Sequence, residues 1–163
     1  MARNRRIARA ERDPDLGMLA ARLLWPLEEE LFARLADCGH GLVRPRHGAL
    51  LAYLDETGVR PTELARLTAQ HKQVVGRVLD ELEELGYVER RPDPTDRRSK
   101  LVLLTERGRD EQAHADRILA DIEARYAAKI GPERYEQFRN LLRELVQPAH
   151  QPAPRSPGHG SEE

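Results

Sequence analysis

Apolar residues recur every three or four positions through most of this chain, which predicts helices rather than strands. The first such stretch covers about residues 15–37, where leucines line one face. Pro26 lies inside it and is expected to kink the helix or mark a boundary within it. Gly39 and Gly41 are expected to end it. The same spacing predicts five further helices, which cover about residues 45–58, 61–69, 71–85, 105–130 and 132–147.

The apolar positions also predict which side of each helix is buried. In the second, third and fourth helices we expect the inward positions to be Leu50, Leu51, Leu54, Leu64, Ala65, Leu67, Val74, Val75, Val78, Leu79, Leu82 and Leu85. In the last two helices the apolar face is formed by Ile118, Ile122, Tyr126, Ile130, Tyr135, Phe138, Leu141, Leu142 and Leu145. Gly86 is a suitable stop for the fourth helix, Thr105 a suitable cap for the fifth, and Gly131 a break before the sixth.

Between the fourth and fifth helices the pattern changes to two short strands. They are predicted at 87–91 and 100–104, with Pro92, Asp93 and Pro94 building the turn. The expected tip carries Asp96, Arg97, Arg98 and Lys100. A cationic hairpin suits a narrow DNA minor groove, where negative potential attracts Arg. The predicted fold is therefore mainly α with a small β-hairpin (α+β): a helix, a short turn at 68–70, a second helix and the hairpin.

Composition narrows the class of protein. The chain has 163 residues, of which 34% are charged and 39% hydrophobic, and its net charge is −1. These values predict a single soluble, helix-rich domain in which any DNA binding depends on locally placed charge. The single cysteine, Cys38, excludes an intramolecular disulfide and fits the cytoplasm. No apolar run approaches membrane-spanning length, and the basic N-terminus lacks the apolar stretch of a secretory signal.

The chain is expected to divide into three parts. Residues 1–14 form a basic flexible arm and residues 148–163 a disordered tail rich in Pro, Gly and Ser. The part between them, 15–147, holds a DNA-binding unit at about 45–104. The helices at about 15–38 and 105–147 carry more apolar surface than that unit can cover. They form either one monomer's core or a dimer interface, and we favour the dimer.

Three segments resemble the MarR-type transcriptional regulators. They are RPTELA at 60–65, KQVVGRVLDELEELGYVERRPDPTDRR at 72–98 and LLTERG at 103–108. The resemblance implies a homodimeric winged helix-turn-helix protein that binds a short palindromic operator on double-stranded DNA. Such proteins usually repress, and usually release DNA when a small ligand or an oxidant reaches them.

The resemblance also implies a DNA-contacting set. The helix that starts near His71 matches the recognition helix, Arg98 matches the residue that enters the minor groove, and Asp96 matches the residue that orients it. The expected DNA contacts are Thr62, His71, Lys72, Gln73, Val74, Gly76, Arg77, Asp96, Arg97, Arg98 and Lys100. An ordinary surface ion pair of Asp96 with Arg98, and a solvated helix face at Lys72 and Gln73, are the alternatives.

Two features depart from the family pattern or oppose DNA binding. The turn before the recognition helix often carries Gly and an apolar residue, but here it holds Ala69 and Gln70. The acidic residues of the recognition helix would oppose binding if they faced phosphates; they are Asp80, Glu81, Glu83 and Glu84.

Three kinds of effector are conceivable. A lipophilic or aromatic-acid ligand would be held by Trp25, Arg46, His47 and Tyr53, unless these are core and phosphate-contacting residues. Oxidant sensing would use Cys38, although it lies at the opposite end of the first helix from the sensing Cys of related regulators. A metal would use Cys38, His40, His47 and His114, a spacing that follows no established motif.

Other classes of protein receive less support. No nucleophile elbow, phosphate-binding loop or paired-His zinc motif is present, so we expect neither an enzyme nor a bound cofactor. A winged-helix module that binds a protein rather than DNA remains as an alternative. The arginines of the hairpin argue against it, since DNA is the partner that such charge suits.

Overall fold

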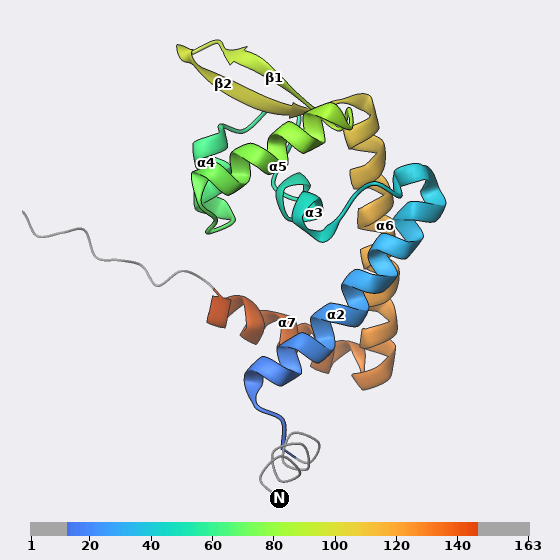
Figure 1. Ribbon diagram of the computed structural model, residues 1–163. Coiled ribbons are helices and arrows are strands. Elements are labelled where there is room, and N and C mark those ends of the chain that lie inside the picture. Colours follow the sequence, from blue (N-terminus) through green and yellow to red (C-terminus); the bar gives the residue numbers. More distant parts are fainter. Residues whose placement is uncertain (1–12, 147–163) are drawn as a thin grey trace, which may run out of the picture. The chain divides into compact units, whose positions relative to one another are not determined.

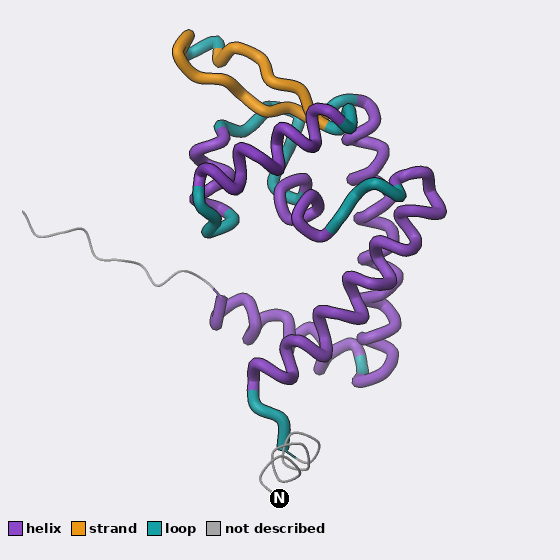
Figure 2. The backbone as a smooth tube through the Cα atoms, in the orientation of Figure 1, coloured by secondary structure: helices purple, strands orange, loops and turns teal. Residues whose placement is uncertain are grey.

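The structure is a computed structural model, and it describes residues 13–146 with the exception of the Arg97 side chain. The expected basic arm and disordered tail therefore lie almost entirely outside the described residues. The chain forms two compact units, residues 1–122 and 123–163. The elements in chain order are α2 (Leu16–Leu35), η1 (Ala36–His40), α3 (Pro45–Leu51), α4 (Pro61–Leu67), α5 (Lys72–Glu84), β1 (Val88–Asp93), β2 (Asp96–Leu104), α6 (Glu106–Ile130) and α7 (Pro132–Val146) (Figure 1). The predicted fold class, mainly helical with one β-hairpin, is confirmed (Figure 2).

The first helix is continuous through Pro26 and does not end there. It begins at the cap Asp15, whose carboxylate accepts a hydrogen bond of 2.9 Å from the backbone N–H of Met18. After Leu35 the chain continues as one wider helical turn, η1, in which Gly39 has a φ of 93°. The expected stop at Gly39 is thus confirmed, because this left-handed backbone favours glycine.

The core of the first unit lies between α3, α4, α5 and the hairpin. Its buried residues include most of those expected from periodicity, among them Leu50, Leu64 and Leu79. The expectation was wrong for Val74 and Leu67, which are 47% and 38% exposed. Val74 lies at the edge of the buried stripe, where an apolar pattern cannot fix which side of the helix faces the core.

The second helix is shorter than predicted, ending at Leu51 instead of continuing to residue 58. The segment after it is held by Asp55, whose Oδ1 accepts hydrogen bonds from the backbone N–H and hydroxyl of Thr57 at 2.8 and 2.7 Å. This side chain offers the backbone an alternative to the helix. Val59 then forms an isolated antiparallel bridge with Val102 of β2, which the sequence did not reveal.

The hairpin is longer and tighter than predicted. β1 and β2 pair antiparallel, and Asp93 lies opposite Asp96, so only Pro94 and Thr95 form the tip. The residues expected at the tip, from Asp96 to Lys100, are therefore in β2. The carboxylate of Asp93 closes the turn, since its Oδ1 accepts from the amide and the hydroxyl of Thr95 at 2.8 and 2.7 Å.

Tyr87 joins the recognition helix, the hairpin and α6. The backbone N–H of Gly86 bonds to Glu83 and that of Tyr87 to Leu82, so that α5 ends in a Schellman motif with Gly86 at a φ of 77°. The carbonyl of Tyr87 accepts from the backbone N–H of Thr105 at 3.0 Å. Thr105 caps α6 as predicted, because its Oγ1 accepts from the backbone N–H of Gly108 at 3.1 Å.

The second unit contains the end of α6 and all of α7. Gly131, with a φ of 93°, separates the two helices as predicted. Glu123 and Arg139 form an ion pair of 3.3 Å between them. No residue of α7 is buried in the described structure, and Leu145 at its end is 74% exposed. Most of the predicted apolar face of this helix is exposed, including Phe138, Leu141, Leu142 and Leu145.

The turn at 68–70 yields a prediction about stability. Ala69 occupies the left-handed position that follows α4, with a φ of 52°, and it is the only non-glycine residue of 13–146 with positive φ. We expect Ala69→Gly to raise the free energy of unfolding by about 0.5–1 kcal/mol, because glycine adopts this backbone without strain. Gly86→Ala, in the equivalent position after α5, should lower it by about 1 kcal/mol. Urea unfolding of both variants checks this, and a destabilised Ala69→Gly protein would contradict it.

Candidate nucleic-acid interface

Helices α4 and α5 form the helix-turn-helix, with α5 as the expected recognition helix (Figure 1). Its first turns present exposed side chains at Lys72, Gln73, Val74 and Arg77. His71 occupies the cap position but makes no side-chain capping bond. The sequence thus correctly placed the start of this helix.

A shallow depression lies where α4 meets the start of α5. Thr62 of α4 and His71, Lys72 and Gln73 of α5 are among the residues that line it. The structure therefore brings together four of the residues expected to contact DNA. Gly76 lies one turn further along α5, and a Cβ at this position would meet no atom within 4 Å. This open space fits the expectation that a duplex can approach the helix closely there.

The cations of this surface differ in whether they have partners. In the described structure, Lys72 and Arg77 of α5 and Arg98 and Lys100 of β2 form no ion pair with a carboxylate. Several other described arginines of the same unit are paired with carboxylates, including Arg60 with Asp93 and Arg66 with Glu63. Others donate to backbone carbonyls instead: Arg44, Arg107, Arg109 and Arg117. The four cations expected to meet phosphates and bases thus have neither a carboxylate nor a backbone carbonyl as a side-chain partner among the described residues. Arg97, also in this set, has no described side chain.

The hairpin of β1 and β2, which forms the wing, differs from expectation in the role of one residue. Asp96 does not hold the guanidinium of Arg98: its Oδ1 accepts the backbone N–H of Arg98 at 3.0 Å, and its Oδ2 accepts the hydroxyl of Ser99 at 2.7 Å. The hydroxyl of Ser99, the backbone N–H of Arg98 and the nearby charge of Arg60 lower the pKa of Asp96. Asp96 therefore fixes the backbone from which Arg98 projects, while the guanidinium itself stays exposed.

Arg60 was not recognised from the sequence as part of the wing. Its Nε donates to Asp93 Oδ2 at 2.7 Å, and its Nη2 lies 3.3 Å from the hydroxyl of Thr95. It thereby links the start of α4 to the tip of the hairpin, between residues more than 30 positions apart. The only signal in the sequence was its place directly before Pro61, which begins α4.

The hydrogen bonds of Asp93 predict that its carboxyl group titrates at unusually low pH. Hydrogen bonds from Thr95, first from its hydroxyl and then from its amide, and the guanidinium of Arg60 lower the pKa of Asp93 from 3.8 to about 2. A lowered carboxyl pKa means that its stabilising contribution is complete above pH 3.8 and is lost as the pH falls through about 2. We expect an NMR titration of this carboxyl to give a midpoint near 2. Thr95→Ala should raise the midpoint, whereas Thr95→Ser should keep it low; equal midpoints in both variants would contradict the assignment.

The acidic residues of α5 are largely neutralised. Arg90 of β1 donates to Asp80 at 2.7 Å and also binds Glu83. Glu81 accepts from Arg46 Nε at 2.8 Å, and its Oε2 lies at the same distance from His47 Nε2. These pairs remove most of the repulsion that the sequence suggested. The pairs of Arg90 join the wing to the recognition helix, and those of Glu81 join the recognition helix to α3.

Two of the four expected ligand residues share a partner in the structure. Arg46 and His47 both contact Glu81, and His47 is buried. Trp25 on α2 is 68% exposed, and Tyr53 after α3 is largely exposed. The aromatic wall and the cationic anchor are therefore present as separate features, and no contact between them is recorded within residues 13–146.

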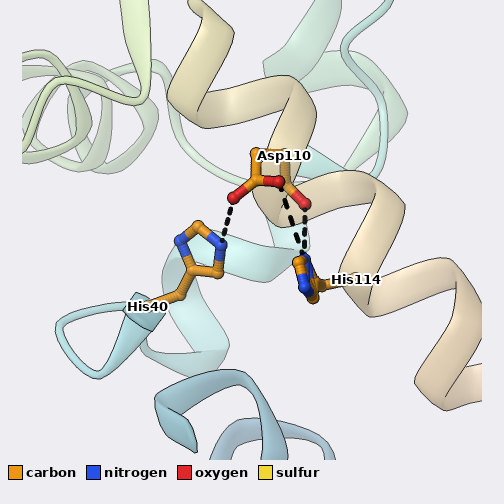
Figure 3. A group of neighbouring side chains, drawn as sticks. All are labelled: His40, Asp110 and His114. Atoms are coloured by element: carbon orange, nitrogen blue, oxygen red, sulfur yellow. Dashed lines mark hydrogen bonds and ion pairs between the residues drawn. The ribbon is translucent and has the colours of Figure 1, made fainter. Parts of the chain in front are cut away.

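The candidate metal ligands that lie together in the structure differ from those expected from the sequence. His40 and His114 lie near one another, as that hypothesis required, but the third residue is Asp110 instead of Cys38 or His47 (Figure 3). The ring centroids of His40 and His114 are 5.6 Å apart, and burial lowers the pKa of His40. Asp110 and His114 are four positions apart on α6, a spacing that places them on one helix face and that the sequence analysis overlooked.

Comparison with known proteins gives a consistent result. The sequence profile of the MarR family matches residues 40–99. An HTH-type transcriptional repressor of Mycobacterium tuberculosis is 30% identical over 133 residues, which are 82% of this chain and 94% of that protein. The crystal structure of CouR from Rhodococcus jostii bound to p-coumaroyl-CoA has a TM-score of 0.70 at 28% identity, covering 85% of this chain and 96% of CouR.

A second structure of CouR, the transcriptional repressor bound to a 23-mer DNA duplex, has a TM-score of 0.71 at 26% identity. It covers 85% of this chain and 97% of that one. Among residues 13–146, none of the helices combines the length and apolar character needed to span a bilayer. The helix-turn-helix, the wing and these similarities together lead to one conclusion: the chain belongs to the MarR family of transcriptional regulators.

Proposed function

We propose that the chain is a cytoplasmic homodimeric repressor that binds a palindromic operator and releases it when a small molecule binds. The observation that carries the DNA part is the set of unpaired cations on α5 and β2, namely Lys72, Arg77, Arg98 and Lys100. Charges without internal partners remain available to phosphates and base edges. The relative from M. tuberculosis is named a repressor, which supports repression over activation.

The roles within the DNA contact follow from position. The start of α5 enters the major groove, where Gln73 reads an adenine edge and Val74 meets a thymine methyl. Thr62 and Lys72 contact phosphates on the flank of the groove. Arg98 enters the adjacent minor groove from the wing, with Lys100 on the phosphates beside it.

A second copy of the chain is the occupant that we propose for the exposed apolar side chains of the terminal helices. Leu16 is 75% exposed on α2, and Leu141 and Leu145 are strongly exposed on α7. Exposed apolar faces of this kind mark interaction surfaces. A two-fold dimer would present two copies of α5 to successive major grooves, about 34 Å apart, which a palindrome requires.

The proposed effector is an aromatic carboxylic acid or a derivative of one. Arg46 is bound to an exposed carboxylate, that of Glu81, so an anionic ligand can replace this partner without leaving a buried charge. Trp25 and Tyr53 offer exposed aromatic surface in the same unit. CouR, a structural neighbour, binds p-coumaroyl-CoA, which contains an aromatic acyl group.

The proposal is tested by selecting bound sequences from a random DNA pool with the full chain, in the presence and absence of aromatic acids. We expect enrichment of an inverted repeat, a dimer in light scattering, and loss of binding with an acid that also quenches Trp25, the single tryptophan. A monomer that retards no duplex at low ionic strength would overturn the proposal.

Gln73→Ala provides a finer test of the recognition helix. Removal of a base-reading amide should cost about 1–3 kcal/mol at the operator and relax the preference at one position per half-site. Binding to non-specific DNA should change little. Competition assays with single-base operator variants measure this, and a uniform loss on all sequences would instead make Gln73 a phosphate contact.

A further inference from the structure

Three side chains near the join of η1 and α6 bring potential metal ligands together (Figure 3). His40, Asp110 and His114 each offer one ligand atom, and these atoms lie within 4.8 Å of one another. Asp110 connects the other two: its Oδ2 lies 3.2 Å from His40 Nε2, and its Oδ1 lies 3.8 Å from His114 Nδ1. The group belongs to the first unit and includes none of the residues assigned to DNA.

His40 is the unusual member of the group. It is only 3% exposed, and its Nε2 is buried without a hydrogen bond, even though Asp110 is close enough for one. The distance between His40 Nε2 and Asp110 Oδ2 would allow a hydrogen bond, but the angle between the two groups does not. Its other nitrogen, Nδ1, lies 3.1 Å from the hydroxyl of Tyr87. When Nδ1 carries the proton and donates it to Tyr87, Nε2 presents a lone pair toward the carboxylate.

We propose that His40, Asp110 and His114 bind a divalent transition-metal ion of the Zn²⁺ class, with His40 ligating through Nε2. Two imidazoles and a carboxylate are ligands that zinc accepts, and three protein ligands leave a fourth position open to a small molecule. In a tetrahedral zinc site the donor atoms lie about 3.3 Å apart. The pair from His40 and Asp110 already has this spacing. To join them on an ion, the half-buried His114 would exchange the 3.1 Å contact of its Nδ1 with the backbone carbonyl of Asp110 for a bond to the metal.

Tyr87 gives the site its outer support. Its hydroxyl holds His40 in one orientation, and the guanidinium carbon of Arg107 lies 4.5 Å from the centre of its ring. A hydrogen bond to the second imidazole nitrogen is the usual support of a histidine ligand. The backbone of Tyr87 also ends α5 and leads into β1. An ion on His40 would therefore act on the residue that joins the recognition helix to the wing.

The site is tested by measuring Zn²⁺ affinity in competition with a chelator, using the full chain without DNA. We expect one tight site per chain, weakened about 10-fold or more in His114→Gln and Asp110→Asn. Tyr87→Phe should weaken it by about 10- to 100-fold through loss of orientation. Cys38→Ser is the matched control, because this exposed thiol lies outside the group and its loss should leave the affinity unchanged.

Two outcomes would overturn the metal site. One is an affinity in His114→Gln and Asp110→Asn equal to that of the wild type. The other is loss of the tight site when His150 and His159 of the terminal segment are both replaced by Gln. Co²⁺ provides a second readout, since bound cobalt should show the visible absorption of a tetrahedral site without a thiolate band. Those visible bands should be absent in His114→Gln.

The effect of the ion on DNA rests on the proposed function, whereas binding of the ion does not. With operator DNA, Zn²⁺ should change the affinity of the wild type and leave that of His114→Gln unaltered. An unchanged affinity in a wild-type protein shown to hold the ion would overturn the coupling through Tyr87. A protein that binds Zn²⁺ but no DNA would instead contradict the proposed function.

Discussion

Arg98→Ala is expected to weaken operator binding roughly 10- to 100-fold while leaving the melting temperature almost unchanged. Arg98 is exposed, its guanidinium has no partner within the described structure, and its backbone is fixed by Asp96. Loss of the side chain therefore removes a DNA contact without disturbing the hairpin. The number of counterions released on binding, measured from the slope of affinity against salt concentration, should also fall by about one. Fluorescence anisotropy at several salt concentrations measures both quantities.

Arg91→Ala is the matched control for this prediction. It removes the same charge from the same hairpin, but Arg91 is paired with Glu89 on its own strand. Its loss should change operator affinity by less than about 3-fold, since exposed ion pairs contribute little. Equal effects of the two substitutions would mean that the wing attracts DNA only through its overall charge. No effect of either would exclude the wing from the interface.

Gly108→Ala is expected to lower the free energy of unfolding by roughly 3 kcal/mol. A Cβ at this position would overlap the carbonyl oxygen of Tyr87 and lie 3.0 Å from Leu104 Cδ2. The oxygen belongs to the backbone and is held by hydrogen bonds from Thr105, so it cannot move without shifting the start of β1. Urea unfolding measures the loss, and a change below about 1 kcal/mol would show that α6 shifts freely against the hairpin.

Gly76→Ala is the contrasting substitution. A Cβ there meets nothing within 4 Å, and a glycine-to-alanine change inside a helix stabilises by about 0.5–1 kcal/mol. If the duplex approaches α5 at this position, the same variant should bind operator more weakly although it is more stable. Unaltered operator affinity would show that Gly76 does not permit close approach.

The sequence correctly predicted the features that depend on residues close together in the chain, such as helix ends and caps. The recognition helix, its stop at Gly86 and the cap at Thr105 were all correct because neighbouring residues build them. The hairpin was predicted with the wrong ends, since its turn depends on how the carboxylate of Asp93 meets Thr95. The repeat of apolar residues likewise could not show that Val74 faces solvent.

Contacts between distant positions were not predictable from these patterns. The link of Arg60 with Asp93 spans 33 positions, and the approach of His40 to Asp110 spans 70. Both depend on how elements pack in three dimensions, which spacing along the chain does not encode. The sequence did identify His40 and His114 as possible ligands. It added Cys38 and His47, which are neighbours of His40 in sequence, and omitted Asp110, which completes the group in space.

The clamp formed by Arg90 has a consequence for the type of duplex that this protein accepts. Arg90 ties β1 to α5 through Asp80 and Glu83, so a movement of the wing away from the helix would break two ion pairs. We therefore expect the wing and the recognition helix to keep one relative placement when they meet a duplex. Double-stranded RNA has a deep, narrow major groove that side chains cannot read. An RNA duplex of the operator sequence should consequently be rejected on shape alone, without any contact that recognises the 2′-hydroxyl.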